Sequence, residues 1–148
     1  MMDIKMIKKN HSKPIRKADD DAKYLIMECL GNEHTGGFDL DSIYKHKEGY
    51  MVLEFLKCDT VKPLHSHPSR YWSKNSQKFL SLWEITQKLE GRLILINYED
   101  SREQFKVIEV LDMNSKGIIK EYTVNCGFQK FKKWFININR RSLGIKEL

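Results

Sequence analysis

The chain has 148 residues, of which 41% are hydrophobic and 31% charged, and its net charge is +6. This composition predicts one globular domain over residues 1–148, and no apolar run approaches the roughly 20 residues that a membrane helix needs. The first ten residues, MMDIKMIKKN, lack the apolar segment of a signal peptide, so we expect a cytoplasmic protein with no membrane contact.

The amino-terminal third predicts a basic segment, a helix and two strands. Residues 1–17 are rich in lysine and form either a flexible arm that contacts phosphates or a solvated tail. Residues 18–31 predict a helix, since three aspartates precede its apolar positions and Gly31 suits its end. Residues 38–45 and 50–58 predict strands joined by a turn at Glu48-Gly49.

The rest of the chain alternates helices with strands. Residues 73–91 predict a helix with an apolar stripe, and residues 92–98, RLILINY, have the continuous apolar character of a buried parallel strand. Residues 105–112 and 117–124 predict a second hairpin, and residues 127–141 predict an amphipathic helix. This order predicts an α/β fold with a mixed central sheet flanked by helices. The expected stripes comprise Phe79, Leu82, Trp83, Thr86 and Leu89 in the first of these helices, and Phe128, Phe131, Phe135 and Ile138 in the second.

Cysteine and histidine spacing gives little sign of a metal site. The three cysteines are far apart and lack a C-x-x-C pair, so we expect reduced thiols that are mostly buried. His65 and His67 could share a metal ion if they lay on a strand, but the adjacent proline and serine favour a surface loop.

Basic residues recur beside aromatic ones in two segments. Residues 69–79 mix cations with aromatic rings, which suits either nucleic-acid contacts or the packing of a helix start. The last helix has lysines opposite its apolar stripe, and Trp134 beside that stripe is expected in the core. The positive net charge permits a nucleic-acid partner without requiring one. The expected nucleic-acid contacts are Arg70, Lys74, Lys130, Lys133 and Arg141.

The first hairpin concentrates acidic residues in two apolar strands. A turn at Glu48-Gly49 makes Asp41 and Glu54 diagonal neighbours on one face, and a four-residue loop makes them directly opposite. Two carboxylates this close repel each other and raise one pKa unless a cation neutralises them. Mg²⁺ accepts a site of one or two carboxylates completed by water and phosphate. The alternative is that these charges simply cover the solvated face of the hairpin.

Lys57 follows Glu54 by three residues. In a regular strand the two side chains point to opposite faces, and a bulge near Phe55-Leu56 would turn Lys57 back toward the carboxylates. There its ammonium group could orient the attacking water and stabilise charge on a phosphate.

At these residues the chain resembles the PD-(D/E)XK nuclease superfamily, which has the restriction-endonuclease-like fold. DLDSIY looks like the family's first element, with Asp41 as the metal-binding aspartate, and VLEFLK looks like the second, with Glu54 and Lys57. The helix and buried strand that follow match the family's order. The chain departs from the family in having Glu-x-x-Lys in place of Glu-x-Lys, and in its weak strand signal before Asp41.

The resemblance implies a Mg²⁺-dependent endonuclease, with Mn²⁺ as a substitute, that hydrolyses phosphodiester bonds in DNA. Asp41 and Glu54 would bind the metal and Lys57 would orient the water. A homodimer would suit the cutting of two strands. The alternatives are a non-catalytic nucleic-acid-binding protein and a protein-interaction module. Residues that could support the site are Glu28, Asp39, Gln77 and Lys78.

Overall fold

The computed structural model describes residues 21–148. Its contacts divide the chain into two compact units, Met1–Asp39 and Leu40–Leu148. The basic segment expected over residues 1–17 lies outside the described residues, so its role stays a prediction, as does the single domain. None of the helices within residues 21–148 is both long and apolar enough to cross a membrane.

The first unit contains helix α2 (Asp21–Leu30), which matches the described part of the predicted helix. Gly31 has a φ of 57°, the left-handed conformation that glycine adopts easily at the end of a helix. An ion pair of 3.3 Å joins Lys23 to Asp39. Residues 31–41 contain no strand, so the strand predicted over 38–45 begins only at Ser42.

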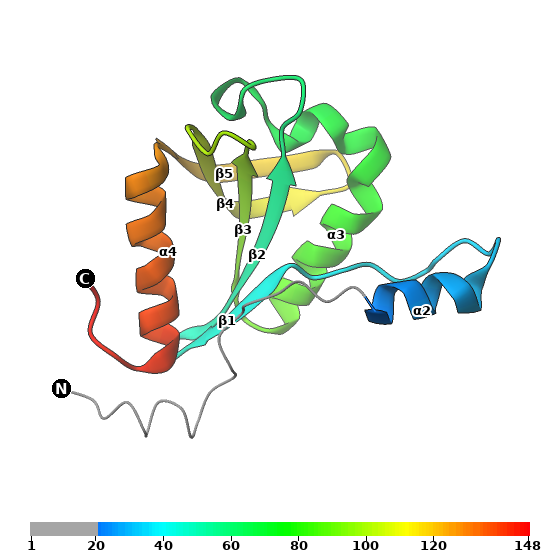
Figure 1. Cartoon of the computed structure of the whole chain (residues 1–148), viewed down its shortest axis with the longest axis horizontal. Coiled ribbons are helices and arrows are strands. Elements are labelled where there is room, and N and C mark those ends of the chain that lie inside the picture. The colour runs from blue at the N-terminus through cyan, green and yellow to red at the C-terminus, as the bar shows by residue number, and fades with distance from the viewer. Residues whose placement is uncertain (1–20) are drawn as a thin grey trace. The chain divides into compact units, whose positions relative to one another are not determined.

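The second unit is built on a five-stranded mixed sheet in the order β1-β2-β3-β4-β5 (Figure 1). Strands β2 and β3 are parallel and the other neighbours are antiparallel. The α/β prediction is therefore confirmed. The elements are β1 (Ser42–His46), β2 (Gly49–Lys57), α3 (Trp72–Lys88), β3 (Arg92–Tyr98), β4 (Phe105–Asn114), β5 (Gly117–Cys126) and α4 (Phe128–Leu143), with two 3₁₀ turns, η1 (Pro63–His65) and η2 (Pro68–Tyr71), before α3.

Helices α3 and α4 cover opposite faces of this sheet (Figure 1). Side chains alternate along a strand, so Val52 packs in the cluster under α3 while Leu53 packs in the cluster under α4. Strand β3 alternates in the same way and is buried on both faces, as its continuous apolar sequence predicted. The faces of β2 therefore decide which helix each of its side chains can meet.

The predicted helical stripes are largely confirmed. In α3, Phe79, Leu82 and Thr86 are buried. In α4, Phe131 and Ile138 are buried, and Trp134 and Phe135 pack partly against the same cluster. Phe128, the first residue of α4, is 40% exposed and departs from the expected stripe.

The cysteine prediction is only partly right. All three thiols are free, but Cys29 is exposed and Cys58 and Cys126 are half-buried. The expected burial is therefore wrong. Cys58 and Cys126 are only half-buried because Cys58 follows the last residue of β2 and Cys126 is the last residue of β5. The core covers strand ends less completely than strand centres.

The turn of the first hairpin lies one residue earlier than predicted. His46 pairs with Gly49, so Lys47-Glu48 form the turn in place of Glu48-Gly49. Ile43 consequently pairs with Val52 rather than with Glu54. The partner of each β1 residue on β2 thus changes by two positions. Every side chain stays on its predicted face, because strand side chains alternate with a period of two.

Gly91 is required where α3 leads into β3. A Cβ atom at this position would lie 2.5 Å from the carbonyl oxygen of Tyr50, a backbone atom that cannot move freely. We expect Gly91→Ala to lower the free energy of unfolding by about 2 kcal/mol, the usual cost of an overpacked position. Urea denaturation would measure this change. Gly36→Ala is the control, since its Cβ would meet nothing within 4 Å, and an equal loss in both variants would contradict the prediction.

Candidate functional site

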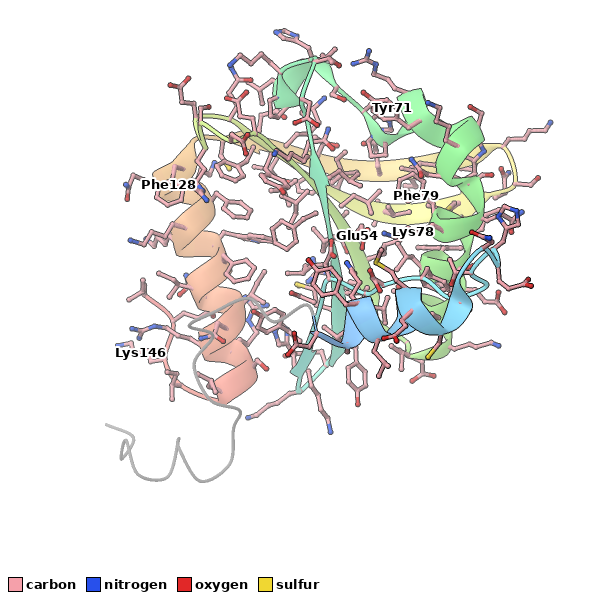
Figure 2. All side chains as sticks on the ribbon, turned by 45° about the vertical axis from the view of Figure 1, so that its right-hand side comes forward. Glu54, Tyr71, Lys78, Phe79, Phe128 and Lys146 are labelled. Atoms are coloured by element: carbon pink, nitrogen blue, oxygen red, sulfur yellow. The ribbon has the colours of Figure 1, made fainter. Side chains whose placement is uncertain are left out.

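Glu54 is a charged residue in the middle of the sheet. It lies two positions after Val52 on β2 and therefore faces α3, where only 2% of its surface is exposed. The Nζ atom of Lys78 on α3 lies 2.6 Å from its Oε1 atom (Figure 2). Its Oε2 atom is buried and has no hydrogen-bond partner in the part of the chain that the structure describes. Burial of such an atom is costly, so this oxygen is a ready acceptor for a proton or a cation.

Asp41 lies beside this glutamate, immediately before β1. Its Oδ2 atom accepts a hydrogen bond of 2.8 Å from the backbone N–H of Phe55. Extending the pairing of β1 with β2 by one residue places Asp41 directly opposite Glu54. This is the arrangement that we expected for a four-residue loop, and the shifted two-residue turn produces it as well. The prediction that these two carboxylates converge is therefore confirmed.

The pKa of Glu54 is raised above its ordinary value. Burial is the largest cause, because it disfavours the charged form. The hydrogen bond from Lys78 lowers the pKa, while the nearby carboxyl group of Asp41 raises it. The lysine thus offsets only part of the cost of a buried carboxylate beside a second one.

Lys57 does not reach the two carboxylates. The register of β2 with β3 is continuous from Met51 to Lys57, so the bulge needed to turn this lysine back is absent there. Its Nζ atom lies 3.1 Å from Asp100 and 3.9 Å from Asp59, and the side chain is 43% exposed. The hydrogen bond to Asp100 is the main cause that raises the pKa of Lys57.

Lys78 takes the position beside Glu54 that the sequence suggested for Lys57. The sequence placed it only among the supporting residues. One signal could have identified it: Lys78 and Leu82 are four residues apart on α3, so the lysine lies at the edge of the buried stripe. A cation at the edge of a buried helix face needs an anion in the neighbouring strand, and Glu54 is the acidic residue of β2.

A cavity of about 530 Å³ opens beside these residues, at the carboxyl ends of the parallel strands β2 and β3. Open α/β sheets commonly bind ligands at this edge. The cavity is walled by the end of β2 and the segment after it, by η2 and the two residues before it, by the start of α3 and by Asn97 on β3. The polar side chains that line it include Glu54, Lys57, Asp59, His67, Asn75 and Lys78.

The loop between β2 and α3 is held by hydrogen bonds of its own. His67 Nδ1 accepts a bond of 3.1 Å from the backbone N–H of Ser69, and His67 Nε2 lies 2.7 Å from Glu121 Oε1 on β5. Asn97 on β3 donates to the carbonyl oxygen of Ser66 at 2.9 Å. His65 and His67 lie in this loop and not on a strand, as expected.

The remaining predicted residues are distributed over several surfaces. Glu28 and Asp39 belong to the first unit, and their role beside the carboxylates stays a prediction. Lys74 and Gln77 are exposed on α3 and do not line the cavity. The predicted nucleic-acid contacts form two groups: Arg70 and Lys74 precede or begin α3, while Lys130, Lys133 and Arg141 are exposed on α4, which covers the opposite face of the sheet.

Comparison with protein-family models, with curated proteins and with solved structures found no match for this chain. Within residues 21–148, no cluster of three or more His, Cys, Asp or Glu side chains is placed to hold a metal ion. The function of the chain is therefore inferred from the geometry of Asp41, Glu54 and Lys78.

Proposed function

We propose that this protein is a divalent-cation-dependent endonuclease that hydrolyses phosphodiester bonds in DNA, built on a restriction-endonuclease-like arrangement. One observation supports it above the others. The buried carboxylate of Glu54 has one oxygen paired with Lys78 and one without a partner, and it lies in the wall of an open cavity. A buried charge that lowers stability is typical of a functional site.

The residues that would hold the cation are Asp41 and Glu54. Two carboxylates are enough for Mg²⁺, which usually keeps several waters and shares its site with substrate phosphate. The unpartnered oxygen of Glu54 fits this assignment because a cation would satisfy it. The chemistry that bound Mg²⁺ supplies is the polarisation of the phosphate and a lower pKa for a water ligand. Mn²⁺ has the same preference for oxygen ligands and could replace it.

Lys78 contributes a positive charge at the same place. Its side chain is 36% exposed, so its ammonium group can meet both Glu54 and a phosphate in the cavity. A donor placed where charge develops in the transition state lowers the barrier most. We therefore give Lys78 the role of positioning the phosphate and water that the sequence suggested for Lys57.

The test is a cleavage assay on supercoiled, linear and branched DNA with Mg²⁺, Mn²⁺ or EDTA. We expect cutting only with metal, and a loss of at least about 100-fold in Asp41→Ala and in Glu54→Ala. Glu48→Gln is the matched control, since it removes one exposed carboxylate from the same hairpin. Full activity in both alanine variants would contradict the proposal.

A second candidate is a non-catalytic nucleic-acid-binding protein. It is favoured by the ion pair itself, because Lys78 already neutralises part of the charge that a metal would neutralise. This candidate predicts binding that weakens with salt and does not require a divalent cation. Binding without cleavage of any substrate, unchanged in Glu54→Ala, would favour it over the nuclease.

A further inference from the structure

The outer wall of the cavity carries polar and aromatic side chains at helical spacing. Tyr71, Asn75 and Lys78 follow one another at intervals of four and three residues through the end of η2 and the start of α3. All three line the cavity, so they lie along one side of this segment. Lys78 is the innermost of the three because it contacts the buried Glu54 (Figure 2).

Tyr71 presents an exposed aromatic ring to the cavity. It is 43% exposed, and within residues 21–148 it makes no ring contact with another aromatic side chain. The guanidinium of Arg70 lies 5.7 Å from its ring centroid. Its neighbour Trp72 differs, since that ring stacks on Phe79 at 6.0 Å and its indole N–H donates to the carbonyl oxygen of Ser115. Trp72 therefore anchors the helix, while Tyr71 is available to a ligand.

Asn75 is likewise available. It is exposed, and its side-chain amide makes no hydrogen bond in the described part of the chain. An amide offers a donor and an acceptor side by side, the pattern that recognises the edge of a nucleobase. The wall thus combines an exposed aromatic ring, a free amide and a lysine, in that order toward the carboxylates.

We propose that this cavity binds one unstacked nucleotide of a DNA strand. The base stacks on Tyr71, its edge meets Asn75, and its phosphate lies toward Lys78 and Glu54. A volume of about 530 Å³ is within the range of small-ligand cavities. The inference rests on the proposed function, because it takes the carboxylates as the place where the phosphate is attacked.

This arrangement selects a class of substrate. Within a continuous duplex both faces of each base are covered by neighbours, so contact with Tyr71 requires extrusion of the nucleotide at a cost of a few kcal/mol. Single strands, frayed ends and flaps do not incur this cost. We therefore infer that the preferred substrate is DNA with single-stranded character.

Fluorescence anisotropy in EDTA tests this inference. The full chain is titrated into a labelled single-stranded oligonucleotide and into a blunt duplex of the same sequence. We expect tighter binding of the single strand, and a loss of about tenfold in that affinity in Tyr71→Ala, the usual effect of removing a stacking ring. Tyr71→Phe should bind as the wild type does, because it keeps the ring. Duplex binding should be unchanged in both variants.

Tyr122→Ala is the matched control, since Tyr122 is 62% exposed on β5 and does not line the cavity. Equal affinity for strand and duplex, no binding of either, or unchanged strand binding in Tyr71→Ala would each overturn the inference. Because the measurement excludes divalent cations, it is independent of cleavage. Strand binding that depends on Tyr71 without cleavage in any metal would leave this inference standing and contradict the nuclease.

Discussion

Lys78→Met should abolish metal-dependent cleavage, whereas Lys57→Met should retain most of it. The reason is geometric, since Lys78 contacts Glu54 at 2.6 Å while Lys57 pairs with Asp100 at the strand end. Removal of a donor that stabilises developing charge costs about 100-fold to 1000-fold in rate. Single-turnover cleavage of a labelled oligonucleotide with saturating Mg²⁺ would measure it. Equal losses in the two variants would contradict the assignment of this role to Lys78.

Lys78→Met should also affect folding. It leaves a buried carboxylate without its cation, which typically costs several kcal/mol, and the partial exposure of Lys78 reduces our expectation to about 2 kcal/mol. The cost should shrink at acid pH, where Glu54 binds a proton. Lys78→Arg is the matched control because it restores the charge. Urea denaturation at several pH values separates this effect from the loss of activity.

Glu54→Gln should make the protein more stable at neutral pH. The pKa of Glu54 is raised in the folded state, so the folded protein binds its proton more tightly than the unfolded chain does. The tighter proton binding stabilises the folded protein. This stabilisation is fully present below the pKa that Glu54 has in the unfolded chain, and it is lost as pH rises through the raised pKa of Glu54 in the folded protein. Glutamine stays neutral and can still accept a hydrogen bond from Lys78. The gap in free energy of unfolding between Glu54→Gln and wild type should therefore widen from about pH 4 to about pH 8.

Mg²⁺ should stabilise the wild type and leave Glu54→Gln unchanged. A ligand that binds only the folded state adds about 1.4 kcal/mol when its concentration is ten times its Kd. A melting curve with and without Mg²⁺ at neutral pH measures this without reference to cleavage. Glu48→Gln should show the same rise in melting temperature with Mg²⁺ as the wild type, because the carboxylate of Glu48 lies at the exposed turn. A shift of the same size in Glu54→Gln would place the cation elsewhere.

Much of the fold could be predicted because its signals are local. RLILINY indicated a strand buried on both faces, and β3 is parallel to β2 with a helix on each side. The stripe through Phe79, Leu82 and Thr86 indicated the buried side of α3. These patterns depend on the 3.6-residue and two-residue periods of helices and strands, which a sequence displays directly.

The meeting of Asp41 and Glu54 could also be predicted, because side-chain alternation brings them to one face under either turn. The sequence by itself could not decide which lysine joins them. Lys57 is near in sequence, but the unbroken register of β2 points it toward Asp100. Lys78 is 24 positions beyond Glu54 and reaches it only because α3 packs over that face of the sheet. Separation along the chain says little about contact between elements, and the partner of a buried charge is therefore a property of tertiary packing.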